Sequence, residues 1–214
     1  MNPIHLKLSP TAEKLPCGTS RFWGNPDLPK GVDYPMYTDE DGEDYPYCFV
    51  CQLNLEEVAE CDPEGRLPHK GLLAFFAKID HFLGYCTGCY DIGGTVSDPD
   101  AVKVFYFPET DNMREVVLVD DDDNELSPHE LQVEFGTAAD ELDDHALFAP
   151  PTYRPWETWD PPFEDWQILL QVDSFEGDDF QLNFMDCGVL DFLIAPEKLE
   201  QHDFSDVRAI VLST

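Results

Sequence analysis

Two pairs of cysteines have the spacing of zinc ligands and give the strongest hint of chemistry in the sequence. Cys48 and Cys51 are separated by two residues, and so are Cys86 and Cys89. A repeated Cys-x-x-Cys pattern is typical of structural zinc sites. The first pair lies in a run that we expect to be a strand. Residues three apart in a strand face opposite sides, so this pair is not expected to bind one ion.

The second pair is geometrically better, because Gly88 permits the tight turn of a zinc knuckle. It has no obvious partner pair, although His81 and Cys61 are conceivable ligands. We therefore expect the thiols to pack as small hydrophobes, with no metal and no cofactor. A redox role is not expected either, because residues 90–94 do not begin a helix that would lower a thiol pKa.

Motifs of calcium binding and of catalysis are missing from the sequence. The acidic runs at 39–44 and 120–123 lack the register of a calcium-binding loop, and we interpret them as solvated loops. There is no nucleophile elbow, no His-Glu-x-x-His motif and no phosphate-binding glycine loop. A cysteine and a histidine brought together by the fold stay open, so the sequence does not decide whether the protein is an enzyme.

Four residues are candidates for binding a ligand. Gln52 and Gln171 each lie in an otherwise apolar run, where they could form a recognition site or satisfy buried backbone groups; we favour the second interpretation. Trp156 and Trp159 belong to a connector at 148–166 that is rich in proline and tryptophan. They could form a platform for a sugar or a peptide, although tryptophans more often anchor such a strap to a core.

Short apolar runs between turn formers predict the secondary structure that would position these residues. Asn54 and Glu57 predict a capped short helix, Ser127 with Glu130 predicts a helical turn, and another helix is expected near Pro196. Strands are predicted at 48–53, 71–77, 102–107, 116–119, 168–172, 188–193 and 208–212.

Two of these regions match each other in order, spacing and residue class. Residues 49–54 correspond to 168–173, and residues 71–76 correspond to 188–193. The separation from glutamine to glycine is 19 residues in the first copy and 17 in the second. We therefore predict one domain over 1–214, with repeat halves at about 18–110 and 150–214. The expected fold is α+β, a mostly antiparallel β-sheet with a few short helices, built from an internal duplication.

The motifs of this repeat carry a family resemblance. They are Pro-Asp-Leu-Pro at 26–29, a Gln-Leu-Asn strand end at 52–54, and Leu-Pro-x-x-Gly-Leu-Leu at 67–73. Over most of 18–110 and 166–214 the chain resembles the YwqG-like proteins, a bacterial domain of unknown function. Trp23 departs from the pattern, which has a small residue there. The resemblance implies a fold dominated by β-sheet and a bacterial cytoplasmic setting, and it brings no known activity or catalytic residues.

Charge limits the partners. Twelve basic residues against 45 acidic ones give a formal net charge of −33. Such a surface repels phosphate, so nucleic acids and anionic membranes are not expected partners, whereas a basic protein is attracted. No apolar run approaches the roughly 20 residues of a membrane span. An odd number of cysteines and no recognisable secretory signal lead us to expect a cytoplasmic protein.

Three kinds of function stay open. The first is a non-enzymatic binding protein whose acidic surface docks a basic protein partner, which we rank first. The second is an enzyme or small-ligand binder with a cleft between the repeat halves. The third is a zinc-stabilised structural module, which metal analysis of the purified protein would decide. The sequence gives no oligomeric state.

Overall fold

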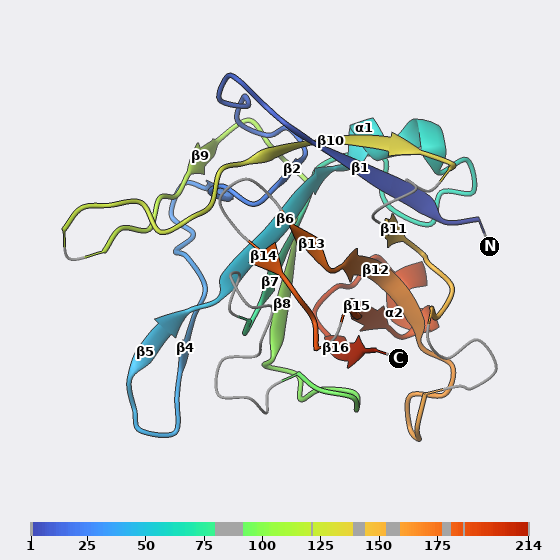
Figure 1. Ribbon diagram of the computed structural model, residues 1–214. Helices are drawn as coiled ribbons and strands as arrows, with labels where there is room; N and C mark the ends of the chain where they lie inside the picture. The colour runs from blue at the N-terminus through green and yellow to red at the C-terminus, as the bar shows by residue number, and fades with distance from the viewer. Residues whose placement is uncertain are drawn as a thin grey trace.

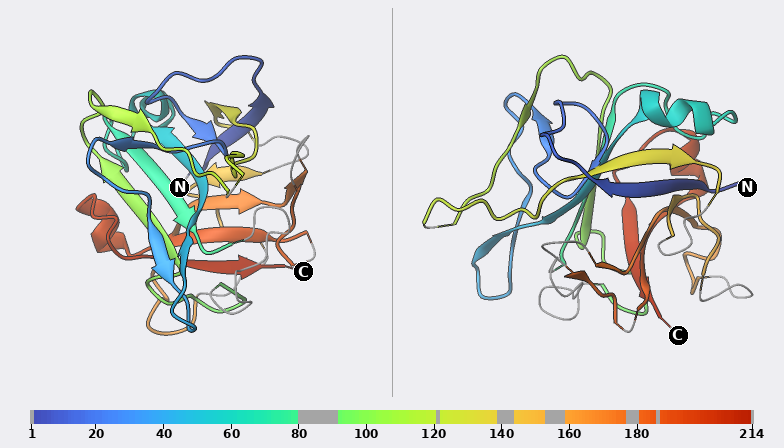
Figure 2. Two further views of the ribbon diagram at one scale, coloured as in Figure 1. Left: turned by 90° about the vertical axis from the view of Figure 1, so that its left-hand side faces the viewer. Right: turned by 45° about the horizontal axis from the view of Figure 1, so that its top comes forward.

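One antiparallel sheet of ten strands dominates the computed structural model, which describes residues 2–79, 92–120, 122–138, 144–152, 159–176, 181–185 and 187–213 (Figure 1). Its strands, in order across the sheet, are β16 (Val207–Leu212), β15 (Val189–Ile194), β12 (Gln167–Asp173), β11 (His145–Leu147), β1 (Ile4–Pro10), β10 (Leu131–Gly136), β2 (Arg21–Phe22), β6 (Cys48–Asn54), β7 (Leu72–Ala77) and β8 (Val102–Phe107). The edge strands β16 and β8 approach each other, so the sheet curls nearly into a barrel (Figure 2).

The remaining elements are short. Three two-stranded ribbons pair β3 (Asp27–Pro29) with β9 (Met113–Glu115), β4 (Met36–Thr38) with β5 (Asp44–Pro46), and β13 (Phe175–Glu176) with β14 (Gln181–Leu182). The helices are α1 (Leu55–Val58), the 3-10 turn η1 (Ala59–Cys61) and α2 (Pro196–Glu200). The predicted antiparallel sheet with a few short helices is confirmed. None of the helices within the described ranges has the length and apolarity to cross a membrane.

The strand order of the large sheet is symmetric. Counted from one edge, β16, β15, β12, β11 and β1 occupy the places that β8, β7, β6, β2 and β10 occupy from the other edge. The strand at the inner end of each set comes from the other part of the chain. The N-terminal strand β1 pairs with β11, and the later strand β10 pairs with β2. At the middle of the sheet β1 pairs with β10, where Lys7 lies opposite Glu134.

Hydrogen-bond register repeats as well as strand order. The pairing of β6 with β7 shifts between Phe49 and Cys51, and that of β12 with β15 shifts between Ile168 and Leu170. A bulge of this kind leaves one extra residue on the strand and changes its twist. In both places the bulge comes at the same position before the glutamine, so Gln52 and its counterpart in β12 occupy matching rows.

One aromatic residue closes each bulge, and it does so in the same way in both places. Trp23 and Phe148 both have a φ of 56°, in the left-handed region that bulky residues rarely adopt. The N–H of Trp23 donates to the carbonyl oxygen of Val50 (2.9 Å), and the N–H of Phe148 donates to that of Leu169 (3.2 Å). Each bulge carbonyl is therefore satisfied by a strained residue on the neighbouring segment.

The core has an interior and two outer layers. Inside the curled sheet, β7 and β15 meet through Phe75 and Phe192, whose ring centroids are 5.2 Å apart. Every residue of β7 and β15 is buried, because loops also cover the outer faces of these strands. One outer layer includes Leu28, and the other includes Trp159 from the proline-rich strap. This explains why both strands are apolar at successive positions and not only at alternate ones.

We expect Gly71→Ala and Gly188→Ala each to lower the free energy of unfolding by about 2 kcal/mol or more. A Cβ on Gly71 would overlap the carbonyl oxygen of Phe107, and one on Gly188 would overlap that of Leu212. Gly136→Ala is the control, because a Cβ there meets open space. Urea denaturation measures all three, and a Gly188→Ala protein as stable as the control would contradict the expectation.

Two local predictions are wrong. Residues 116–119 do not form a strand, and the strand in this region is β9, which ends at Glu115. The predicted helical turn at 127–130 is absent, because its polar side chains bind elsewhere. Ser127 Oγ donates to Asn25 Oδ1 (3.0 Å), and the Glu130 carboxylate accepts from the N–H of Leu15 (2.6 Å). The helix cap predicted at Asn54 is confirmed, since its Oδ1 accepts from the N–H of Glu56 (3.0 Å).

Candidate functional site

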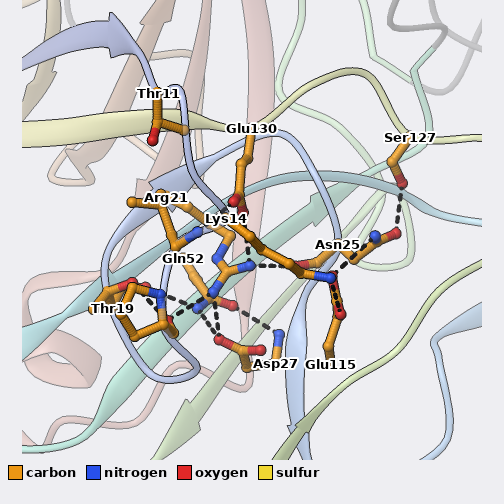
Figure 3. Close-up of polar contacts among 12 residues, drawn as sticks. Thr11, Lys14, Thr19, Arg21, Asn25, Asp27, Gln52, Glu115, Ser127 and Glu130 are labelled. Carbon is orange, nitrogen blue, oxygen red and sulfur yellow. Dashed lines mark hydrogen bonds and ion pairs between the residues drawn. The ribbon is translucent and has the colours of Figure 1, made fainter.

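Gln52, one of the candidate binding residues, is fully buried and holds a loop on the sheet. Its Oε1 accepts a hydrogen bond from the N–H of Asp27 (2.8 Å). Its Nε2 donates to the carbonyl oxygen of Thr19 (2.9 Å) and to Asp27 Oδ2 (2.7 Å), as Figure 3 shows. All three bonds go to the loop at 16–29, so this amide holds the loop in place on the sheet.

Arg21 is the centre of the polar cluster around Gln52. Its side chain is 1% exposed, and its Nη2 donates to Asp27 Oδ2 (3.0 Å) and to the carbonyl oxygen of Pro16 (3.0 Å). Its Nη1 donates to Glu130 Oε2 (2.8 Å) (Figure 3). The planar guanidinium can bind two carboxylates at once, which a lysine ammonium cannot do with the same geometry. The arginine therefore ties together the 16–29 loop and the segment that leads into β10.

Asn25 connects this cluster to an acidic projection. Its Nδ2 donates to carboxylate oxygens of Glu115 and Glu125, and its Oδ1 accepts from Ser127 Oγ. One amide thus holds both ends of the segment between Glu115 and Ser127. Residues 118–126, called here the 118–126 hairpin, project from the body beyond this point (Figure 1).

A second acidic projection is built on the same kind of turn. It consists of β4, β5 and the loop between them, called here the 36–46 hairpin. Asp39 Oδ1 accepts from the N–H groups of Asp41 and Glu43, at 2.9 Å each. In the 118–126 hairpin, Asp120 Oδ1 accepts from the N–H groups two and four residues later, at 2.9 and 2.8 Å. One carboxylate therefore shapes each turn, while Glu40, Asp41, Glu43, Asp122 and Asp123 are exposed to solvent.

The two hairpins carry the same strong charge. Each contains five acidic residues and no basic one. Both project from the same side of the molecule in Figure 1 and in the right-hand view of Figure 2. Two carboxylate-rich tips on one side create a field that attracts cations and cationic proteins and repels phosphates.

An apolar pocket lies at the base of the two hairpins, with a volume of about 250 Å³. Trp23 and Phe49 belong to its floor as buried core residues, while Pro46 comes from one hairpin and Leu118 and Leu126 from the other. The N–H of Leu126 donates to the carbonyl oxygen of Leu118, so these two residues are cross-strand neighbours. The pocket is therefore bounded by both acidic projections.

Exposed apolar side chains gather on the same two projections and the segment leading into them. Six large hydrophobic residues stand out as exposed in the described part of the chain, and five lie there. They are Met36, Tyr45, Val117, Val119 and Leu126. Scattered exposed hydrophobic residues need no explanation, whereas a group beside a pocket is typical of an interaction surface.

Gln171 occupies the matching row in the other half of the sheet. Its Oε1 accepts from Thr152 Oγ1 (2.7 Å), and its Nε2 donates to the carbonyl oxygen of Asp144 (2.9 Å). Four strands separate β12 from β6 in either direction around the sheet. Gln52 and Gln171 therefore do not converge on one site.

Two titratable groups near Gln171 are fully buried. Asp191 lies opposite Gln171 in β15, and neither of its carboxylate oxygens has a hydrogen-bond partner among the described residues. Burial, reinforced by the nearby Asp173, raises the pKa of Asp191 well above its usual value. Burial also lowers the pKa of His145 to about 4, so this imidazole is neutral at pH 7. Its Nδ1 accepts from the N–H of Asp173 (3.1 Å).

The comparison with known proteins identifies a family. The family described as a domain of unknown function, DUF1963, matches residues 20–154 and, in a second overlapping match, residues 142–211. The chain belongs to the DUF1963 family. No curated protein matches it. The matches span both halves of the large sheet, including the 16–29 loop from Ser20 onward, and both acidic hairpins of this DUF1963 chain.

The strap tryptophans of the DUF1963 chain were candidates for a ligand platform. Trp159 is 4% exposed, and its Nε1 donates to the carbonyl oxygen of Trp166 (2.9 Å). It packs in the outer layer of the second half with Ile168 and Leu193. Trp156, the other candidate, lies outside the described residues.

For the cysteines, one step of the sequence argument is wrong. The bulge in β6 places Cys48 opposite Ala77 and Cys51 opposite Phe75. Both of those partners face the interior, and both cysteines contact the interior cluster, so residues three apart do not face opposite sides here. Burial raises the pKa of the Cys51 thiol, which opposes the thiolate that zinc needs. Cys86, Cys89 and His81 lie outside the described residues.

Sequence reasoning missed Arg21, Asp27, Glu130 and Asp191 in this DUF1963 chain. A signal for two of them was present, because Arg21 precedes Phe22 and Trp23, and Asp191 interrupts the apolar run of β15. A charged residue among large apolar ones is rarely buried without a special reason. Asp27 and Glu130 gave no such signal, since 45 acidic residues make any single carboxylate inconspicuous.

Proposed function

We propose that this protein is a non-enzymatic binding protein that docks a basic protein partner through its two acidic hairpins. The single observation that carries the proposal is the placement of nine acidic residues, and no basic ones, among the described residues of two projections on the same side. Complementary charge steers encounter and suppresses partners of the wrong sign. A formal net charge of −33 extends the attraction to the whole surface.

A matched set of charge variants tests the proposal. In the hairpin variant, five exposed acids are neutralised: Glu40→Gln, Asp41→Asn, Glu43→Gln, Asp122→Asn and Asp123→Asn. The control variant makes the same charge change far along the chain, at Asp160→Asn, Glu164→Gln, Asp165→Asn, Glu197→Gln and Glu200→Gln. The turn-forming Asp39 and Asp120 are left intact.

Each protein is purified with a tag from its native host at about 0.1 M and about 1 M salt, where the screening lengths are about 10 and 3 Å. We expect a basic protein to be retained in near-equal amounts by the unchanged chain and the control variant at the lower salt. It should be lost from the hairpin variant and at the higher salt. Recovery of the bare chain in every case, or equal loss from both variants, would contradict the proposal.

The alternative function is the binding of a small ligand in a cleft, and a groove in the structure favours it. A groove of about 450 Å³ runs beside β10, within the size range of small-molecule sites. Glu57, Glu60 and Glu134 line it, so a small cation would suit it. Neither Gln52 nor Gln171 is among its lining residues. Native mass spectra of host-purified protein that show only the unliganded mass would leave this alternative without support.

We also propose that the chain is built from an internal duplication, as the sequence repeat predicts. The symmetric strand order, the equal bulges and the matching pair of Trp23 and Phe148 support it. Failure of the two sets of strands to superpose under one rotation would contradict it. The YwqG-like resemblance, the bacterial origin and the cytoplasmic location are part of the same proposal, and cell fractionation tests the last of them.

A further inference from the structure

We propose that the apolar pocket between the two acidic hairpins is an anchor site for a large apolar side chain on a basic segment of the protein partner. This inference rests on the proposed function and adds the chemistry of the segment that is recognised. The pocket lies between the bases of the hairpins, so a segment seated in it has acidic residues on both sides.

The size of the pocket fits a side chain better than a free ligand. Its volume of about 250 Å³ is below the roughly 300 Å³ at which small-molecule sites begin. Its wall combines aromatic rings with aliphatic groups, including Tyr34, Phe49, Leu118 and Leu126. Protein interfaces commonly place a buried apolar anchor at the centre and charged groups around it.

The hairpins present apolar side chains next to the pocket. In the 36–46 hairpin, Met36 lies opposite Pro46, which lines the pocket, and directly paired residues of a ribbon share one face. In the 118–126 hairpin, Leu118 and Leu126 form the corresponding pair. Met36 is 49% and Leu126 is 46% exposed, so a partner would remove both from water.

Charge complementarity decides the occupant. The hairpins whose bases bound the pocket carry Glu40, Asp41, Glu43, Asp122 and Asp123, all of them exposed. A second copy of this chain would bring the same negative charge and would be repelled. An acidic or neutral peptide would leave these carboxylates without counter-charges. A segment with lysine or arginine on both sides of a leucine, methionine or phenylalanine satisfies both the pocket and its rim.

The buried polar cluster explains how the pocket is held open. Asn25 fixes both ends of the 118–126 hairpin, and Arg21 fixes Glu130 just beyond it. In the other hairpin, the N–H of Tyr47 donates to the carbonyl oxygen of Pro35 (3.1 Å). A site whose walls are fixed before binding loses less conformational entropy when the partner arrives.

Two synthetic octapeptides of equal charge test the inference on the full chain. Both carry a pair of lysines at each end; one has Leu-Phe at the centre and the other has Ser-Ser. Binding is measured by fluorescence anisotropy at about 0.1 M salt. We expect the Leu-Phe peptide to bind at least about tenfold more tightly, since burial of one large apolar side chain has an effect of this size.

Pocket variants show where the preference arises. Leu126→Ser should remove most of the preference for the Leu-Phe peptide, and Leu118→Ser is a second variant of the same wall. Met185→Ser is the control, because Met185 is 54% exposed, lies outside both hairpins and does not line the pocket. Circular dichroism confirms that each variant is folded.

The outcomes separate this inference from the proposed function. Equal, salt-sensitive binding of both peptides overturns the pocket as an anchor and leaves the acidic docking surface in place. A preference that survives both pocket variants also overturns it, and so does an absence of saturable binding by the Leu-Phe peptide. The pull-down with charge variants decides the docking surface independently, whichever way the peptides behave.

Discussion

Arg21→Met is expected to lower the free energy of unfolding by about 3–5 kcal/mol, the usual cost of removing one partner from a buried ion pair. Arg21 and Asp27 are 1% and 0% exposed, and their atoms Nη2 and Oδ2 are 3.0 Å apart. Methionine replaces much of the volume of the arginine but cannot donate to Asp27 or Glu130. The loss should be read from urea denaturation, with the midpoint compared at equal slope.

A double variant distinguishes loss of charge balance from loss of packing. Arg21→Met/Asp27→Asn removes both charges, and the asparagine keeps a side-chain oxygen for Gln52 Nε2. We expect it to recover a large part of the lost stability, because the cost arises mainly from the unpaired carboxylate of Asp27, whereas Glu130 is partly exposed and still accepts from the N–H of Leu15. Arg21 lies opposite Gln52, and in the second half of the sheet Ala146 lies opposite Gln171. An arginine is therefore not required at this position of the sheet. A double variant no more stable than Arg21→Met would contradict the argument.

The strands that the sequence predicts best are those covered on both faces. β7 and β15 are buried at every position, and this makes them apolar at successive positions, with Asp191 as the one charged exception, so they are easy to recognise. β6 and β12 also share one burial pattern, so residues of the same class stand at matching positions, among them Gln52 and Gln171. A repeated pattern of this kind indicates equivalent rows in a sheet but does not say which strands lie between them.

The strands that join the halves were not predicted, although they carry a period of two. In β1 the inward residues include Ile4 and Leu6, and in β10 they include Leu131 and Val133. These two strands pair across more than a hundred residues of chain. Short-range patterns do not reveal such a pairing, and loop closure over this distance leaves no mark on local sequence.

The predicted helical turn at Ser127 shows the limit of a local motif. Its capping pattern was present, but Ser127 donates to Asn25 and Glu130 binds Arg21. Partners from a distant loop replaced the backbone N–H groups that a cap would have used. The candidate site depends on these long-range hydrogen bonds, because they position the base of the 118–126 hairpin. A helix at 127–130 would not give Ser127 and Glu130 these partners, so the predicted helix and the candidate site are incompatible.

Removal of the buried carboxyl of Asp191 is expected to stabilise the protein as the pH rises. In the matching row of the first half, the residue opposite the glutamine is Ala74, so Asp191→Ala copies a side chain that the fold already accepts. At pH 8 we expect Asp191→Ala to be more stable than the unchanged chain by about 2 kcal/mol or more, because an unpaired buried carboxylate is lost.

The sign of the pH dependence follows from the raised pKa of Asp191. A carboxyl whose pKa is higher in the folded state stabilises fully below its unfolded pKa of about 3.8, and this contribution is lost as the pH rises through the folded value. The advantage of Asp191→Ala should therefore grow by about 1.4 kcal/mol per pH unit above pH 4 and then level off. Urea denaturation from pH 4 to pH 8 measures it, with the exposed-site variant Asp165→Ala expected to stay within about 0.5 kcal/mol of the unchanged chain.

A constant difference between Asp191→Ala and the unchanged chain would mean that the carboxyl has found a partner. Since Ala74 serves the first half without any polar group, a stabilised Asp191→Ala protein would also mean that folding is not the reason for an acid in this row.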